Sequence, residues 1–290
     1  GSIMSKKLAA GTDAIVLDVT VGDGAFMKNK ESALELAKSM VDIGKRAEKK
    51  IAAVLTNMDE PLGYAVGNNL EVIEAINSLN GKGPKDLMEV VYALGSQMIV
   101  FSGIESDKTK ARSLMEEAVA SGKAIDKFVE FIKAQGGDES YAKDISKFAP
   151  AKYIIPVEAE CDGYIHAMKA ETFGLASMSL GGGRETFDDI IDMSVGIVLS
   201  KKVGDAVKKG EIYCYIHSND EVKAKHAIEM IKGATEISPE KCDHSGHLFP
   251  QERFRLWYQH EQRLECSFCR FEGHRGMGRV WNKQCQLCET

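Results

Sequence analysis

The sequence predicts an α/β protein whose first part contains a parallel sheet and whose second part is a small β-rich lobe. Two short apolar, β-branched segments, at residues 13–22 and 50–57, are typical of buried strands. A segment with apolar residues at helical spacing follows each of them, and this alternating order favours a parallel sheet. From residue 150 onward, short strand-like runs alternate with glycine turns, which indicates the lobe.

Residues that start and stop helices and strands mark the limits of these elements. Ser2 is placed as the N-cap of a first short helix, and Gly11 stands just after its end. Gly22 closes the first strand. In chain order we expect a helix over 2–10, a strand over 13–22, a helix over 30–49, a strand over 50–57, a helix over 67–79, nearly continuous helix over 84–135, short strands over 150–218 and one amphipathic helix over 219–234.

Length, charge and cysteine content limit the class of protein. The 290 residues are enough for one large domain or two small ones. The net charge of -6 argues against broad electrostatic binding of nucleic acid by the whole chain. We find no apolar run long enough for a membrane span and no signal-peptide pattern, so no membrane partner is expected. Seven cysteines are too few for a disulfide scaffold, which favours a reducing, cytoplasmic location.

Several motif-like stretches have a structural interpretation beside a functional one. "GDGAFMK" at 22–28 fits a phosphate cradle or a tight turn, and the turn is favoured because Met27 replaces the third glycine of the dinucleotide fingerprint. "GGGRETF" at 181–187 is interpreted as a flexible corner. In "AMKAE", Lys169 resembles a biotin acceptor at a hairpin tip, but Ala170 replaces the expected methionine, which disfavours biotinylation. Three isolated histidines are interpreted as surface or packed residues: His166, His217 and His226.

Three separated blocks of the sequence carry a specific resemblance. They are "GSIMSKKLAAGTDAIVLDVTVGDGAFMK" at 1–28, "LTNMDEPLGYAVGNNLEVIEAI" at 55–76 and "DMSVGIVLSKKVGDAVKKGEIYCYIHSND" at 192–220. Together they closely resemble the pyrimidine-nucleoside phosphorylases, the group that includes thymidine phosphorylase. The resemblance implies a partial phosphorylase α/β domain over residues 1–149 and a β-rich C-terminal phosphorylase lobe with its helix over 150–241.

The resemblance implies an activity and two sets of binding residues. Members of this family cleave a pyrimidine nucleoside with inorganic phosphate as co-substrate, giving free base and ribose or deoxyribose 1-phosphate. Ser2 and Lys6 match family residues that hold the base, and their i, i+4 spacing places them on one helix face. A lysine there stabilises the negative charge that develops on the leaving base. The backbone carbonyls of Leu62 and Ala65 and the carboxylate of Glu74 match a monovalent cation site, for an ion such as potassium.

The family pattern also contains parts that we do not find in the 290 residues. These are a glycine- and serine-rich phosphate loop with its lysine, a catalytic histidine and a base-binding arginine. In addition, Thr20 stands where relatives often have lysine. We therefore assign no catalytic residue and expect a truncated phosphorylase with little or no phosphorolysis by itself. We also expect self-association, or a protein partner such as the missing half covering an exposed sheet edge.

The composition changes at Cys242, so residues 242–290 form a separate C-terminal module. Six arginines, both tryptophans, five cysteines and four histidines lie in this segment. Two C-x₂-C pairs separated by fifteen residues fit a structural, four-coordinate zinc site. Its ligands are Cys266, Cys269, Cys285 and Cys288. A second zinc, or an interleaved arrangement, is drawn from Cys242, His244, His247, His260 and His274.

The function of this module stays open at the level of sequence. Residues 249–265 are predicted to form an amphipathic helix. Seven basic and six acidic residues give a balance of only +1, so protein binding is at least as well favoured as nucleic-acid binding. The alternative function is a non-enzymatic scaffold or fusion whose working part is this zinc module. The sequence does not distinguish a natural chain from an engineered fusion, whose tail would then come from a nuclear or other intracellular protein.

Overall fold

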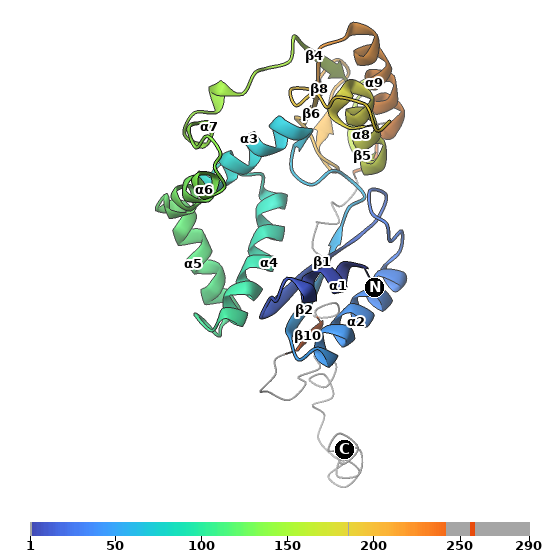
Figure 1. Ribbon diagram of the computed structural model, residues 1–290. Coiled ribbons are helices and arrows are strands. Elements are labelled where there is room, and N and C mark those ends of the chain that lie inside the picture. The colour runs from blue at the N-terminus through green and yellow to red at the C-terminus, as the bar shows by residue number, and fades with distance from the viewer. Residues whose placement is uncertain (1, 185, 242–255, 259–290) are drawn as a thin grey trace.

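The computed structural model describes residues 2–184, 186–241 and 256–258. Figure 1 shows the strands β1 and β2 beside the N-terminal helices, a group of helices on one side, and the β-rich lobe above them. The α/β class and the small sheets expected from the sequence are confirmed.

The first sheet is parallel, as predicted. β1 (Ala14–Val21) pairs with β2 (Lys50–Asn57) in register from Ala14 opposite Lys50 to Val21 opposite Asn57. α2 (Lys30–Arg46) connects the two strands and packs on both. β2 coincides with the predicted strand, because seven of its eight positions are buried and its central residues 51–55 are all apolar.

The first helix is also confirmed. α1 (Ser2–Ala9) turns Met4 into the core of the sheet, where it is 2% exposed, and Gly11 follows with a left-handed φ of 71°. Ser2 is the first residue of the helix rather than the residue before it. The remaining residues of α1 from Ser2 to Lys7 are exposed.

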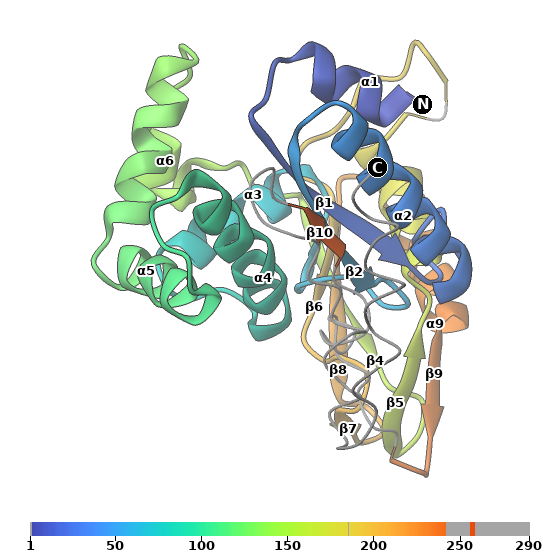
Figure 2. The same cartoon turned by 90° about the horizontal axis from the view of Figure 1, so that it is seen from below.

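The chain from residue 68 to residue 147 is mostly helical, as the sequence predicts for residues 67–79 and 84–135. They are α3 (Asn68–Leu79), α4 (Lys85–Ser102), α5 (Lys108–Ala120), α6 (Lys123–Ala134), the short α7 (Ser140–Lys143) and the 3₁₀ turn η1 (Ile145–Lys147). Figure 2 shows α4, α5 and α6 together on one side of the sheet. α4 packs on β1 and β2, and Arg112 of α5 binds Glu89 of α4 through two hydrogen bonds of 2.8 and 2.6 Å.

Two small sheets build the lobe. One has the order β3-β6-β8-β4 and the other β7-β5-β9. α9 begins after Asp220, whose carboxylate accepts hydrogen bonds from the N–H groups of Val222 and Lys223. The bounds are β3 (Ala65–Val66), β4 (Tyr153–Glu158), β5 (Gly163–Met168), β6 (Gly196–Leu199), β7 (Ala206–Val207), β8 (Ile212–Ser218), α9 (Glu221–Ala234) and β9 (Thr235–Ser238).

One segment of the lobe differs from the prediction. Residues 170–182 form α8 (Ala170–Ser177) and a π turn, η2 (Met178–Gly182), instead of strands between glycine turns. The physical reason is a helical pattern that the glycines concealed: Phe173 and Ala176 are three residues apart and both fully buried. Lys169 directly precedes this helix, so it does not lie at a hairpin tip.

A short strand from the C-terminal segment completes the first sheet. β10 (Leu256–Tyr258) pairs antiparallel with β2, placing Leu256 opposite Ala53 and Tyr258 opposite Ile51. The helix predicted over 249–265 is therefore wrong at these three positions. Leu-Trp-Tyr includes two aromatic residues that favour strands, and β2 offers them an edge for main-chain pairing.

The zinc predictions lie outside the described residues. This holds for Cys266, Cys269, Cys285 and Cys288, and for Cys242, His244, His247, His260 and His274. Within the described ranges, no group of three or more His, Cys, Asp or Glu side chains is arranged to hold a metal ion. No helix in this part of the chain combines the length and the apolar character of a membrane span. The cytoplasmic location stays a prediction.

Candidate base and cation sites

Ser2 and Lys6 lie on the exposed side of α1, one helical turn apart. Buried Met4 anchors the opposite side of the same turn against the sheet. The main-chain carbonyl of Lys6 accepts the N–H of Ala10 at 3.1 Å, while its ammonium forms no hydrogen bond or ion pair with any described residue and is available to a ligand. The structure thus brings the two predicted base-binding residues to one surface.

The turn after β1 is held by protein contacts rather than left open for a ligand. The N–H of Asp23 donates to Asp59 Oδ1 at 3.1 Å, and the N–H of Gly24 donates to the Met58 carbonyl at 2.8 Å. Gly22 has a φ of 124°, and a Cβ at this position would overlap with Asp59. These contacts support the tight-turn interpretation of residues 22–28.

The same turn connects the α/β part to the lobe. Asp23 Oδ2 accepts a hydrogen bond of 2.9 Å from the N–H of Glu171, in the first turn of α8. The Lys28 ammonium bonds the Asp23 carbonyl at 2.6 Å and the Glu171 carboxylate at 3.0 Å. Residues 22–28 therefore act as a joint between two segments far apart in the sequence.

Glu74 binds the loop that follows β2. Its Oε1 accepts hydrogen bonds from the N–H groups of Tyr64 at 2.7 Å and Ala65 at 3.1 Å. Gly63, with a φ of 72°, lies so close that a Cβ on it would overlap with Glu74 Oε2. The predicted cation ligands Ala65 and Glu74 are thus brought together, and Leu62 directly precedes the glycine that touches Glu74.

The carbonyl of Ala65 faces the same side as Glu74. In the pairing of β3 with β6, the Tyr64 carbonyl accepts a hydrogen bond of 2.7 Å from the N–H of Leu199. Successive residues of a strand point their main-chain groups to opposite edges, so the N–H and C=O of Ala65 point away from β6. That edge is where the Ala65 N–H meets Glu74.

The Glu74 carboxyl lies in a partly buried and acidic setting. Burial raises the pKa of its carboxyl, the hydrogen bonds from Tyr64 and Ala65 act against this, and the charges of Asp86 and Glu71 raise it further. A carboxylate that is costly to ionise in this position gains from a nearby positive charge.

A lysine that sequence reasoning missed lies under the same loop. The ammonium of Lys202, which is buried, contacts the carbonyls of Pro61 and Gly63, the latter at 3.0 Å. It also lies 3.1 Å from Asp86 Oδ2 and 3.6 Å from Glu60 Oε2. Lysine is almost never buried without such partners. In the sequence, Lys202 is one of two adjacent lysines, and nothing marks it as the internal one.

A second feature missed from the sequence is a side-chain hydrogen bond between β1 and β2. The hydroxyl of Thr56 donates a hydrogen bond of 2.7 Å to Asp18 Oδ1. Burial raises the pKa of the Asp18 carboxyl, while the hydrogen bond from Thr56 opposes the rise. Thr20, the departure from the family pattern, lies two residues on along β1, opposite Thr56 in the strand register.

Two family models match the chain. The glycosyl transferase family a/b domain matches residues 2–125, and the pyrimidine nucleoside phosphorylase C-terminal domain matches residues 164–238. A pyrimidine-nucleoside phosphorylase of Geobacillus stearothermophilus is 52% identical over 228 residues, which cover 77% of this chain and 53% of the relative. One from Bacillus subtilis is 49% identical over 248 residues, covering 84% of this chain and 57% of the relative.

The chain belongs to the pyrimidine-nucleoside phosphorylase family. These relatives form a pentosyltransferase family, and the matched residues include both sites described above. The chain spans about half the length of the curated relatives it matches, and the two family models match residues between 2 and 238.

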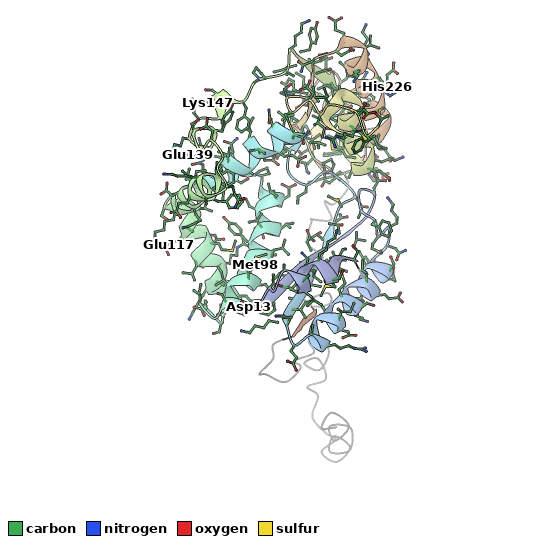
Figure 3. The ribbon with its side chains drawn as sticks, in the orientation of Figure 1. Asp13, Met98, Glu117, Glu139, Lys147 and His226 are labelled. Carbon is green, nitrogen blue, oxygen red and sulfur yellow. The ribbon has the colours of Figure 1, made fainter. Side chains whose placement is uncertain are left out.

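The isolated histidines and cysteines of this phosphorylase-like chain form no further site in the described ranges. Figure 3 shows His226 on the outer side of the lobe. His166 is exposed, and burial lowers the pKa of His217. Cys161 is exposed and Cys214 is buried, and burial raises the pKa of the Cys214 thiol to about 12.

Proposed function

We propose that this chain takes part in the phosphorolysis of pyrimidine nucleosides, transferring the pentosyl group from the base to inorganic phosphate. The observation that carries the proposal is the pairing of Ser2 and Lys6 on the exposed side of α1. The high identity to curated pyrimidine-nucleoside phosphorylases supports it.

The proposed chemistry of α1 follows from its two side chains. The Ser2 hydroxyl hydrogen-bonds a polar edge of the pyrimidine, and the Lys6 ammonium donates to an oxygen of the ring. As the glycosidic bond breaks, the base takes up negative charge, and an ammonium already in place stabilises that charge without reorganisation. The anchoring of α1 through Met4 keeps both groups in position.

We propose that a monovalent cation such as potassium binds the carbonyls of Leu62 and Ala65 and the carboxylate of Glu74. Oxygen ligands of this kind suit a hard cation. The direction of the Ala65 main chain, the approach of Gly63 to Glu74 and the raised pKa of the Glu74 carboxyl support this assignment.

We further propose that residues 1–290, as an isolated polypeptide, bind the base but release it slowly from a nucleoside. The glycine turn considered for phosphate uses the N–H groups of Asp23 and Gly24 for protein acceptors. A phosphate that is not held in place makes a poor nucleophile. Isothermal titration with thymine and with phosphate separates the two halves of this proposal, and thymine binding without phosphate binding is expected.

A turnover assay tests the second half of this proposal, the slow release of the base. Thymidine and uridine are incubated with phosphate and the purified chain, and free base is measured by chromatography. Release at the rates typical of enzymes, on the order of 1–10³ per second, contradicts the proposed slow turnover. Absence of both thymine and phosphate binding leaves the C-terminal module as the seat of function.

We propose that residues 242–290 form a structural zinc module with a closed four-cysteine site. Its proposed role is to bind a protein, and nucleic-acid binding is the alternative. The support is the spacing of Cys266, Cys269, Cys285 and Cys288. Metal analysis by mass spectrometry is expected to find zinc, and Cys285→Ser is expected to lose about one ion per chain. An unchanged zinc content contradicts the four-cysteine site, and the zinc that remains tests the second cluster.

A further inference from the structure

Lys202 joins three segments that lie far apart in the sequence. It follows β6 of the lobe, while Gly63 follows β2 and Asp86 lies in the first turn of α4. Its ammonium lies 3.0 Å from the Gly63 carbonyl and 3.1 Å from Asp86 Oδ2, and it also contacts the Pro61 carbonyl. The protein thus places a cation of its own beneath the loop that carries Leu62.

The ammonium fixes the peptide group between Gly63 and Tyr64. In a trans peptide the C=O and N–H point in opposite directions. The C=O of this group points to Lys202, and its N–H donates to Glu74 Oε1 at 2.7 Å. Lys202 and Glu74 therefore lie on opposite sides of the loop. Each of them binds one polar end of the same peptide group.

The peptide group between Leu62 and Gly63 is fixed in the same way. Its N–H, from Gly63, donates to Asp86 Oδ2 at 3.0 Å, the oxygen that also faces Lys202. The Leu62 carbonyl must then point away from Asp86. With the Pro61 carbonyl also on the ammonium, the peptide groups on either side of Leu62 are both restrained.

We propose that Lys202 is the positioning residue of the monovalent cation site, because its ammonium sets the direction of the Leu62 carbonyl and the placement of the loop against Glu74. This inference rests on the cation site put forward under the proposed function. A site built from loop carbonyls needs its ligands held within about 0.5 Å, and Lys202 supplies that restraint from outside the ligand shell.

The charge of Lys202 also balances two carboxylates that lie under the loop. Glu60 and Asp86 are both largely buried, and Glu60 Oε2 further accepts the N–H of Val203 at 3.0 Å. Removing the ammonium takes a positive charge away from two largely buried carboxylates, which raises the cost of keeping both of them ionised. We expect the loop at 60–65 to rearrange, so that the Leu62 carbonyl no longer points toward the cation site.

The test measures potassium affinity in Lys202→Met, which keeps the unbranched stem of the side chain and removes the ammonium with its charge. Thermal unfolding is followed in potassium chloride, with tetramethylammonium chloride keeping the ionic strength constant, because a ligand that binds the native state raises the midpoint. We expect the apparent dissociation constant for potassium to rise at least about tenfold, and the preference for potassium over sodium to shrink. Lys201→Met is the matched control, since Lys201 pairs with Glu211 at 2.7 Å and does not touch the loop.

The outcomes separate this inference from the proposed function. An unsubstituted chain with no potassium-specific rise in the midpoint contradicts the cation site itself. A clear rise that survives Lys202→Met, at unchanged affinity and selectivity, contradicts the role of Lys202 and leaves the cation site standing. If circular dichroism shows that Lys202→Met does not fold, Asp86→Asn decides the matter. It keeps an acceptor for Gly63 and is expected to weaken potassium binding about threefold, whereas unchanged binding overturns the inference.

Discussion

Gly63 and Glu74 are in such close contact that no side chain fits between them. A Cβ on Gly63 would overlap with Glu74 Oε2, and the φ of 72° at Gly63 is itself unfavourable for other residues. The glycine lets the loop approach the carboxylate, so the contact shapes the proposed cation site.

Gly63→Ala is therefore expected to be more damaging than an alanine at another left-handed glycine. Gly136 has a φ of 74° and nothing within 4 Å of an added Cβ, so Gly136→Ala reports backbone strain alone. We expect the free energy of unfolding to fall by about 1 kcal/mol for Gly136→Ala and by at least about 2 kcal/mol for Gly63→Ala. Urea unfolding measures both, and equal losses contradict the contact with Glu74.

The core of the lobe predicts how two phenylalanine substitutions change the free energy of unfolding. Phe173 in α8 is fully buried among residues of both small sheets, whereas Phe187 is 90% exposed. Phe173→Ala is expected to lower the free energy of unfolding by about 3–5 kcal/mol, since it leaves a large cavity. Phe187→Ala should stay within about 0.5 kcal/mol of the unsubstituted chain. A small effect at Phe173 in the same urea experiment contradicts the helical packing described for α8.

The two described cysteines should differ in their reaction with iodoacetamide. The thiolate is the reactive form, and burial raises the pKa of Cys214 to about 12, so at pH 8 this residue is almost entirely a thiol. Raising the pH toward 9 increases its thiolate fraction and still leaves it small. We expect peptide mapping by mass spectrometry to find alkylated Cys161 and unmodified Cys214 in the native chain. Rapid labelling of Cys214 before unfolding is inconsistent with its buried place in β8.

The sequence predicts the regular elements well where local pattern and burial agree. The strand over 50–57 coincides with β2 because both of its faces are covered, which requires an unbroken apolar run. The helix at α1 and the turn at Gly22 follow from local signals that the fold does not override. The glycines of residues 170–182 predict turns, whereas the burial of Phe173 and Ala176, three residues apart, requires a helix there.

Only part of the candidate site can be predicted from the sequence. Local resemblance places Ser2, Lys6, Leu62, Ala65 and Glu74, since each lies within a matching block. The resemblance does not identify Lys202 or Asp86 as partners of the loop at 60–65. Lys202 contacts a residue 141 positions away in the sequence, and Asp86 contacts one 23 positions away. Contacts of this range depend on the completed fold and leave no mark in local periodicity.

The pyrimidine-binding role of α1 is tested most directly by calorimetric titration of thymine into the chain, into Lys6→Met and into Lys7→Met. Both lysines are exposed on the same helix, so the two variants differ in the face that loses its charge. We predict thymine binding by the unsubstituted chain, at least about tenfold weaker binding by Lys6→Met, and nearly unchanged binding by Lys7→Met. Equal affinities for all three chains would contradict the account.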